Sequence, residues 1–131
     1  MAGLAFCGNV CTYCPRYIAT TSGSMEGLKT VVELWYRCGW RDTVVSAMEI
    51  ACHGCRSIQW CRYGISQCAL ERKVDNCGRC NDYPCVKLAQ ALEKSERFSS
   101  ICNDVCSRTD YELLHRAFFT KKENLERVSQ L

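Results

Sequence analysis

The sequence predicts a small, mainly α-helical domain whose cysteine-knuckle loops are stabilised by metal, with little or no β-sheet. Three observations support this fold class. Cysteine accounts for 13 of the 131 residues, close to the fraction that marks a cysteine scaffold. Apolar residues recur at helical spacing on both sides of the cysteine-rich stretch. The alternating pattern of a β-strand is weak throughout, so any sheet should be a short hairpin.

The length and composition indicate one domain that covers residues 1–131. A chain of this length ordinarily forms a single domain, and its 47% hydrophobic and 24% charged residues are typical of a globular protein. No apolar run approaches the roughly 18 residues of a membrane helix, so no membrane partner is expected. The net charge of +3 counts every thiol as neutral. Two zinc ions, each bound by four thiolates, would lower it by four to −1, so the charge does not indicate a polyanionic partner.

Two helices are expected in the first half of the chain. Leu28, Val31, Val32, Trp35 and Cys38 recur at helical spacing and predict a helix over 25–38. Ser24 suits its N-cap and Gly39 its end. A second, short helix is predicted over 42–51, with an apolar side formed by Val44, Val45, Met48 and Ala51.

The second half of the chain is expected to begin as loops and to end as helices. Residues 52–85 hold seven cysteines with little periodicity, which is typical of loops and knuckles. A helix should begin near Asp82, which can cap it, with Pro84 in its first turn. A last helix is predicted over about 110–128, with Asp110 as its cap.

Ten clustered cysteines have spacings that suit metal binding. Tetrahedral zinc binds sulfur at about 2.3 Å, so its ligands must lie within roughly 4 Å of one another. A C-x2-C turn achieves this without strain, and Gly54 and Gly78 ease the two such turns. One C-x2-C alone is a weak signal, but two together with a C-x3-C-x2-C are a strong one. The predicted ligands are Cys7, Cys11, Cys14, Cys52, Cys55, Cys61, Cys68, Cys77, Cys80 and Cys85.

Metal binding is favoured over a disulfide framework. Disulfides require an oxidising compartment, and residues 1–6 are too short and lack the basic residue of a signal peptide. The odd number of cysteines would also leave a thiol unpaired. We therefore expect a cytoplasmic metal-binding protein.

The remaining cysteines and both histidines have ordinary structural interpretations. Cys38 continues an apolar helix face, and buried free cysteine is a common core residue. Cys102 and Cys106 could share a helix face and bind metal, but no third ligand lies nearby in sequence. We therefore interpret all three as core residues. His53 and His115 are expected to be polar surface residues.

The ordered set of motifs resembles one family, the prokaryotic cysteine-rich family called domain of unknown function 3795. The resemblance covers about residues 5–90 and leaves 91–131 as a C-terminal helical extension. It implies zinc binding without an established biochemical role. All ten clustered cysteines match motif positions, whereas Cys38, Cys102 and Cys106 do not. The motifs are Cys7-Gly8-x-x-Cys11-x-x-Cys14-Pro15-x-Tyr17, Cys52-His53-Gly54-Cys55, Trp60-Cys61-Arg62-Tyr63-Gly64-Ile65-x-x-Cys68 and Asn76-Cys77-Gly78-x-Cys80-x-Asp82-Tyr83-Pro84-Cys85.

Structural zinc is the favoured function, with two closed four-thiolate sites built from eight of the ten cysteines. Closed sites leave the metal no open position and therefore imply no hydrolytic chemistry. One grouping joins the two C-x2-C pairs, and the other joins Cys11 and Cys14 with two further cysteines. The first site would be Cys52, Cys55, Cys77 and Cys80; the two further ligands of the second would come from Cys7, Cys61, Cys68 and Cys85.

An iron–sulfur protein is the alternative, since four thiolates suit either zinc or a cluster. C-x3-C-x2-C is also the signature by which radical SAM enzymes hold a cluster, but those enzymes need a much larger α/β barrel. An iron–sulfur cluster for electron transfer or redox sensing remains an alternative.

A binding module for nucleic acid or protein is a third hypothesis. Arginines beside aromatic residues suit base stacking, but Glu71, Asp75 and Asp82 interrupt the basic stretch. Solvated charge around a metal knuckle is the commoner explanation. A protein partner or a homodimer also stays open. The residues concerned are Arg56, Arg62, Arg72, Lys73 and Arg79, with Trp60 and Tyr63.

A thiol-based enzyme is the fourth hypothesis and has the least support. Two clustered cysteines remain once eight bind zinc, and Cys7 or Cys85 could be such a thiol. Cys85 lies near a predicted helix N-terminus, a location that lowers thiol pKa values in general. The sequence has no Ser/His/Asp set, phosphate loop or paired carboxylates, and no catalytic residue is assigned.

Overall fold

The fold is mainly α-helical in the computed structural model, which describes residues 4–54, 61 and 63–130. The described residues contain no strand, and Leu4 and Val10 form an isolated antiparallel bridge. The predicted fold class, a small mainly α protein without a sheet, is therefore confirmed. In chain order the elements are the 3-10 helix η1 Cys11–Tyr13, α1 Pro15–Thr21, α2 Met25–Arg37, α3 Ala47–Ile50, α4 Ile65–Arg72, the 3-10 helix η3 Cys77–Arg79, α5 Val86–Val105, α6 Arg108–Phe118 and α7 Lys121–Ser129.

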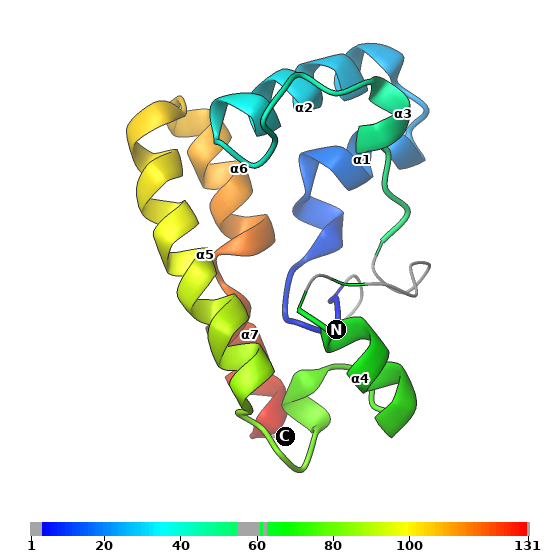
Figure 1. Ribbon diagram of the computed structural model, residues 1–131, viewed down its shortest axis with the longest axis vertical. Helices are drawn as coiled ribbons and strands as arrows, with labels where there is room; N and C mark the ends of the chain where they lie inside the picture. Colours follow the sequence, from blue (N-terminus) through cyan, green and yellow to red (C-terminus); the bar gives the residue numbers. More distant parts are fainter. Residues whose placement is uncertain (1–3, 55–60, 62, 131) are drawn as a thin grey trace.

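The long helix α5 forms one side of the molecule (Figure 1). α6 packs beside its second half, and α7 continues towards its first half, where it contacts η3. α2 lies across the end of the α5–α6 pair, with α1 and α3 packed against it. In the described part of the chain, no helix combines the length and the apolarity needed to cross a membrane.

Helix α2 confirms the prediction for residues 25–38. The side chain of Ser24 caps it by accepting a 2.9 Å hydrogen bond from the Gly27 N–H. Its apolar face is buried, and Trp35 at 4% exposure is the largest side chain on it. Capping and amphipathic spacing agree here, so local and tertiary preferences select the same helix.

The helix predicted over 42–51 is mostly absent. Only Ala47–Ile50 is helical, and the Ser46 side chain caps this single turn by accepting from Glu49 N–H. The predicted apolar side was right for Val45 and Ala51, which pack against the hydrophobic core, and wrong for Val44 and Met48, which are 54% and 80% exposed. Ile50, which is fully buried, anchors the segment to α2 instead.

The stretch 52–85, predicted as loops, contains helix α4. Gly64 precedes it with a φ of +74°, a left-handed conformation that glycine adopts without strain. Ile65 and Ala69 lie one turn apart and are both 2% exposed, so they fix the helix to the protein interior. Two buried positions carry too little periodicity for a helix to be recognised from sequence.

Helix α5 begins at Val86, later than predicted, and its N-cap is Cys85 rather than Asp82. Asp82 instead forms an ion pair with Arg72 of α4, with 2.6 Å between the guanidinium nitrogen and the carboxylate oxygen. The predicted position of Cys85 at a helix N-terminus is confirmed.

The C-terminal helix predicted over 110–128 is two helices, α6 and α7, separated at Phe119 and Thr120. Ser107, rather than Asp110, caps α6 and accepts a 3.1 Å hydrogen bond from the Asp110 N–H. Both residue types cap helices well, and the serine one turn earlier takes the position. Helix α1, which starts at Pro15, was not predicted.

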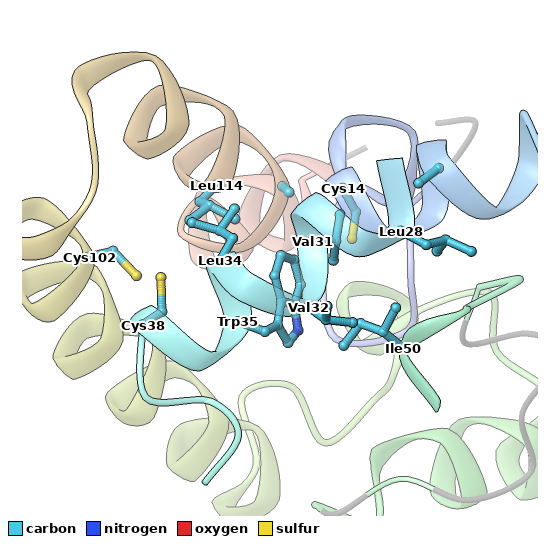
Figure 2. Close-up of a cluster of buried hydrophobic side chains, with 12 residues drawn as sticks. Cys14, Leu28, Val31, Val32, Leu34, Trp35, Cys38, Ile50, Cys102 and Leu114 are labelled. Carbon is cyan, nitrogen blue, oxygen red and sulfur yellow. The ribbon is translucent and has the colours of Figure 1, made fainter. Parts of the chain in front are cut away.

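Three hydrophobic clusters hold the described elements together, and the smallest joins Leu4 and Val10 to Val128 of α7. The larger cluster joins α1, α2, α3, α5 and α6 around Trp35, Cys38 and Leu114 (Figure 2). The smaller cluster joins Phe6 to α4, α5 and α7 and is flanked by several of the clustered cysteines. The predicted metal ligands therefore lie beside a packed core rather than on isolated loops.

Candidate metal centres

Cys77 and its nearest cysteines form the first candidate centre. The Cys77 N–H donates a 2.8 Å hydrogen bond to the carbonyl oxygen of Phe6, which brings the knuckle at η3 against the N-terminal segment. Cys7, Cys77 and Cys85 all pack against the smaller hydrophobic cluster. Residues about 70 positions apart in sequence are thereby adjacent in space.

The electrostatics of Cys77 identify the thiols around it. Burial, followed by the neighbouring thiolates, raises the pKa of Cys77 to about 12. The neighbouring thiols lie on different elements: Cys68 is in α4, Cys80 is the C-cap of η3, and Cys85 is the N-cap of α5. Five thiols supply one more ligand than a tetrahedral ion needs. We call this set the Cys77 group; its members are Cys7, Cys68, Cys77, Cys80 and Cys85.

Arg72 borders the Cys77 group on its solvent side. Its Nη1 donates a 3.4 Å hydrogen bond to the Sγ of Cys80 while also contacting Asp82. The Asp82 carboxylate and the Cys80 thiol raise the pKa of this guanidinium. The hydrogen bond to Cys80 ties the end of η3 to α4 at a predicted metal ligand.

Cys14 is the centre of a second set of thiols. Burial raises the pKa of Cys14 to about 11, hydrogen bonds from backbone N–H groups of Tyr17 and Arg16 lower it, and the thiolates of Cys52 and Cys11 raise it further. We call Cys11, Cys14 and Cys52 the Cys14 group. Backbone N–H groups that point at sulfur are a feature of metal knuckles, and they stabilise thiolate charge.

Cys52 is positioned by two hydrogen bonds. Its N–H donates to Thr20 Oγ1 over 2.9 Å, which ties it to α1. Its Sγ accepts a 3.4 Å hydrogen bond from the Gly54 N–H. Gly54 has a φ of +98°, so glycine suits this turn as the spacing predicts. Its knuckle partner, Cys55, lies outside the described residues.

The two groups meet at one cavity of about 370 Å³. Its wall includes Cys7 from the Cys77 group, all three members of the Cys14 group, and Cys61. Trp35, Trp40 and Phe118 line another part of the same cavity. Five of the nine described clustered thiols thus line one cavity, whereas Cys68, Cys77, Cys80 and Cys85 do not line it.

The expected grouping of these cysteines stays a prediction, and the described neighbours favour a different one. Cys52 was expected to share an ion with Cys77 and Cys80, but its thiol neighbour is Cys14. Cys77 and Cys80 instead have Cys7, Cys68 and Cys85 as neighbours. The reason is the path of the chain, since α1 draws Cys52 towards Cys14 while Phe6 draws Cys77 towards Cys7. That the ten cysteines bind metal stays a prediction.

Helix α7 packs against the chain at two glycines beside members of the Cys77 group. Gly8 follows Cys7, and Gly78 follows Cys77. A Cβ on Gly8, whose φ is +97°, would lie 2.8 Å from the carbonyl oxygen of Lys121. A Cβ on Gly78 would lie even closer, 2.6 Å from the carbonyl oxygen of Leu125. Asn124 Nδ2 donates a 3.0 Å hydrogen bond to the carbonyl oxygen of Gly8. Glycine is required at both positions because the helix backbone leaves no space for a side chain.

Cys38, Cys102 and Cys106 form a third cluster that the sequence interpretation missed. Their three Sγ atoms all lie within 4.8 Å of one another, so the cluster could hold a metal ion. Cys38 and Cys106 Sγ atoms are 3.4 Å apart, and the sulfur atoms of Cys38 and Cys102 point at each other in Figure 2. The i, i+4 spacing of Cys102 and Cys106 was the available signal. The third thiol comes from α2, far away in sequence.

The interpretation of these three cysteines as core residues is therefore incomplete. Cys38 and Cys102 are buried as expected, at 1% and 0% exposure. A hydrogen bond with Cys102, followed by burial, raises the pKa of Cys38 above its ordinary value. Burial, followed by a hydrogen bond with Cys38, raises the pKa of Cys106 to about 11. The three thiols interact as a unit.

The remaining residues considered in the sequence are the two histidines and the basic and aromatic residues of the possible nucleic-acid site. His53 and His115 are exposed, which confirms the surface interpretation of both. Of the residues proposed to stack on nucleic acid, Arg56, Trp60 and Arg62 lie outside the described residues, and nucleic-acid binding stays a prediction.

Comparison with known proteins identifies a family and no function. A family model described as a protein of unknown function, DUF3795, matches residues 3–90. No curated protein matches the chain, and no solved structure does. The matched segment contains all ten clustered cysteines and Cys38, whereas Cys102 and Cys106 lie beyond it.

Proposed function

We propose that this chain, which belongs to the DUF3795 family, holds zinc ions through its ten clustered cysteines and uses them to stabilise its fold. One observation supports the proposal: the partly buried thiol of Cys77 has four other thiols near enough to raise its pKa, three from other parts of the chain and one from its own knuckle. Thiols from separate segments must come together before they can share a metal ion. Zinc would draw the sulfur atoms to about 3.8 Å from one another, closer than any three of these thiols lie in the described part of the chain, where the Cys38, Cys102 and Cys106 sulfur atoms are the set within 4.8 Å.

The donor set favours zinc. Thiolates are soft ligands that select zinc, Cu(I) or iron–sulfur clusters over magnesium, calcium or manganese. The Cys77 group offers five thiols, enough for a closed four-thiolate site. The Cys14 group offers three, and the two-residue spacing predicts that Cys55 supplies the fourth. Two closed sites have no open coordination position, so they support a structural role rather than hydrolysis.

The positions of the ligands explain what such ions would stabilise. In the Cys77 group, a single ion would join the N-terminal segment at Cys7 to α4 at Cys68, to η3 and to the start of α5. In the Cys14 group, it would join α1 to the segment that follows α3. An ion that joins these segments would supply folding free energy directly.

Elemental analysis of anaerobically purified protein, together with its visible spectrum, tests the proposal. The wild-type chain should be colourless and contain zinc. Because the Cys77 group has a surplus thiol, the test needs double variants: C77S/C80S and C11S/C14S should each lose one zinc ion per chain. The matched control is H53A, which removes an exposed side chain beside the Cys52 ligand and should keep the wild-type zinc content.

Two results would overturn the proposal. Iron with absorption in the visible range would assign the cysteines to an iron–sulfur cluster instead. Wild-type zinc content in both double variants would show that the clustered cysteines are not the ligands.

A further inference from the structure

We propose that Cys38, Cys102 and Cys106 form a separate three-thiolate site for a soft, thiophilic metal ion. The site does not depend on the clustered cysteines. It lies at the opposite end of α5 from Cys85 and joins the C-terminal end of α2 to the C-terminal end of α5. Two of its three ligands lie outside the segment that the family model matches.

The sulfur geometry fits a metal ion. An ion that binds three or four thiolates at about 2.3 Å holds their sulfur atoms about 3.8–4.0 Å apart. In the structure, the Cys38 and Cys106 sulfur atoms are 3.4 Å apart, and no pair in the cluster exceeds 4.8 Å. Changes of no more than about 1 Å in the sulfur–sulfur distances would therefore complete the site. A disulfide fits less well, because its sulfur atoms must approach to about 2.05 Å and one of the three thiols would be excluded.

The backbone positions the three thiols and favours a cation between them. Cys38 is the C-cap of α2 and Cys106 is the C-cap of α5, while Cys102 lies one turn earlier on the same face of α5. Helix C-termini carry partial negative charge, which attracts cations. Two such ends converge here, and both helices are held by the larger hydrophobic cluster. The ligands are thus fixed by packed helices rather than by loops.

The surroundings select the class of ion. Cys38 and Cys102 are fully buried, whereas Cys106 is partly exposed and offers the access route. The cluster contains three sulfur donors and no carboxylate or imidazole from the described residues. A set of three thiolates excludes magnesium, calcium and manganese, which require oxygen ligands. It suits an ion that accepts three sulfur ligands, with water available as a fourth on the Cys106 side. Binding would release the three thiol protons to solvent.

Cd(II) is a suitable probe, because it is thiophilic and its thiolate complexes absorb in the ultraviolet. The reduced full-length chain is saturated with Cd(II) anaerobically, and bound ions are counted by native mass spectrometry. We expect C106S to bind one ion fewer than the wild type. L114V trims a fully buried side chain in the same hydrophobic cluster without removing a thiol, and it should bind as many ions as the wild type.

A second measurement keeps the test independent of variant folding and of the clustered cysteines. In the wild-type chain, Cd(II) should protect Cys106 from alkylation by iodoacetamide. The same protection should persist in C77S/C80S, which removes a different ion. If Cd(II) protects Cys106 in C77S/C80S and that variant keeps the wild-type zinc content, the structural zinc proposal is contradicted and the three-thiolate site is not.

Three outcomes would overturn the three-thiolate site. The first is an unchanged ion count in C106S. The second is full alkylation of Cys106 in the Cd(II)-saturated wild type. The third is a disulfide between Cys38 and Cys106 in the metal-loaded protein, detected by peptide mapping without reductant.

Discussion

Gly78 lies directly against the carbonyl oxygen of Leu125, at a position where a Cβ atom would be only 2.6 Å from that oxygen. The knuckle that carries Cys77 and Cys80 is therefore in backbone contact with α7. This contact couples the C-terminal helix to the candidate metal centre, and it explains why the second knuckle contains glycine.

Replacing Gly78 with alanine should force the knuckle and α7 apart. We expect G78A to lower the free energy of unfolding by about 1–3 kcal/mol, as for other substitutions that overfill a packed site. Urea unfolding followed by circular dichroism measures the change. G39A is the control: its Cβ meets no atom within 4 Å, but its φ of +79° costs about 1 kcal/mol in backbone strain. Equal losses in both variants would contradict the packing explanation.

Asn124 provides a second connection between α7 and the knuckles. It is 6% exposed, and its Nδ2 donates to the Gly8 carbonyl oxygen. N124A would leave this buried carbonyl without its side-chain donor, so we expect a loss of about 1–3 kcal/mol in the free energy of unfolding. N103A, on the exposed surface of α5, should change it by less than about 0.5 kcal/mol. A similar small effect for N124A would show that the connection contributes little.

Metal removal should destabilise the whole chain. If zinc joins the N-terminal segment, α4, η3 and α5, a chelator of high zinc affinity should lower the melting temperature, and added zinc should restore it. Thermal unfolding by circular dichroism, with zinc content measured on the same samples, checks this expectation. An unchanged melting profile after complete metal removal would refute a structural role.

Arg72 should affect metal affinity more than fold stability. R72Q removes the positive charge 3.4 Å from the Cys80 sulfur, and we expect zinc affinity to fall several-fold, since residues that contact metal ligands tune their affinity. Competition with a chromophoric zinc chelator measures the change. K73Q removes the same charge one residue along the chain and should retain wild-type affinity. Equal losses in the two variants would indicate only a general effect of net charge.

Much of the fold could be predicted from sequence where local and tertiary preferences agree. Helix α2 has a good cap at Ser24 and a continuous apolar face, and it forms as expected. Helix α4 was missed because two buried residues, Ile65 and Ala69, do not make a recognisable period. The C-terminal helix was predicted as one element because its two halves share an apolar spacing that hides the interruption at Phe119.

The candidate site was less predictable, because it depends on which segments meet in space. Local spacing singles out the C-x2-C pairs as candidate ligands, but it does not say which cysteines come together in space. The position of Cys52 is decided by a hydrogen bond to Thr20, and that of Cys77 by one to Phe6. The cluster of Cys38, Cys102 and Cys106 was the hardest to predict, since 68 residues separate Cys38 from Cys106. No local pattern relates these two residues.

The hydrogen bond between Asn124 and Gly8 has a consequence for the order of events during synthesis. Its two partners are 116 residues apart, so the ribosome makes the segment that carries Cys7 and Gly8 long before it makes helix α7, which packs over that segment. The backbone contacts that α7 makes with Gly8 can therefore form only after nearly the whole chain has been synthesised.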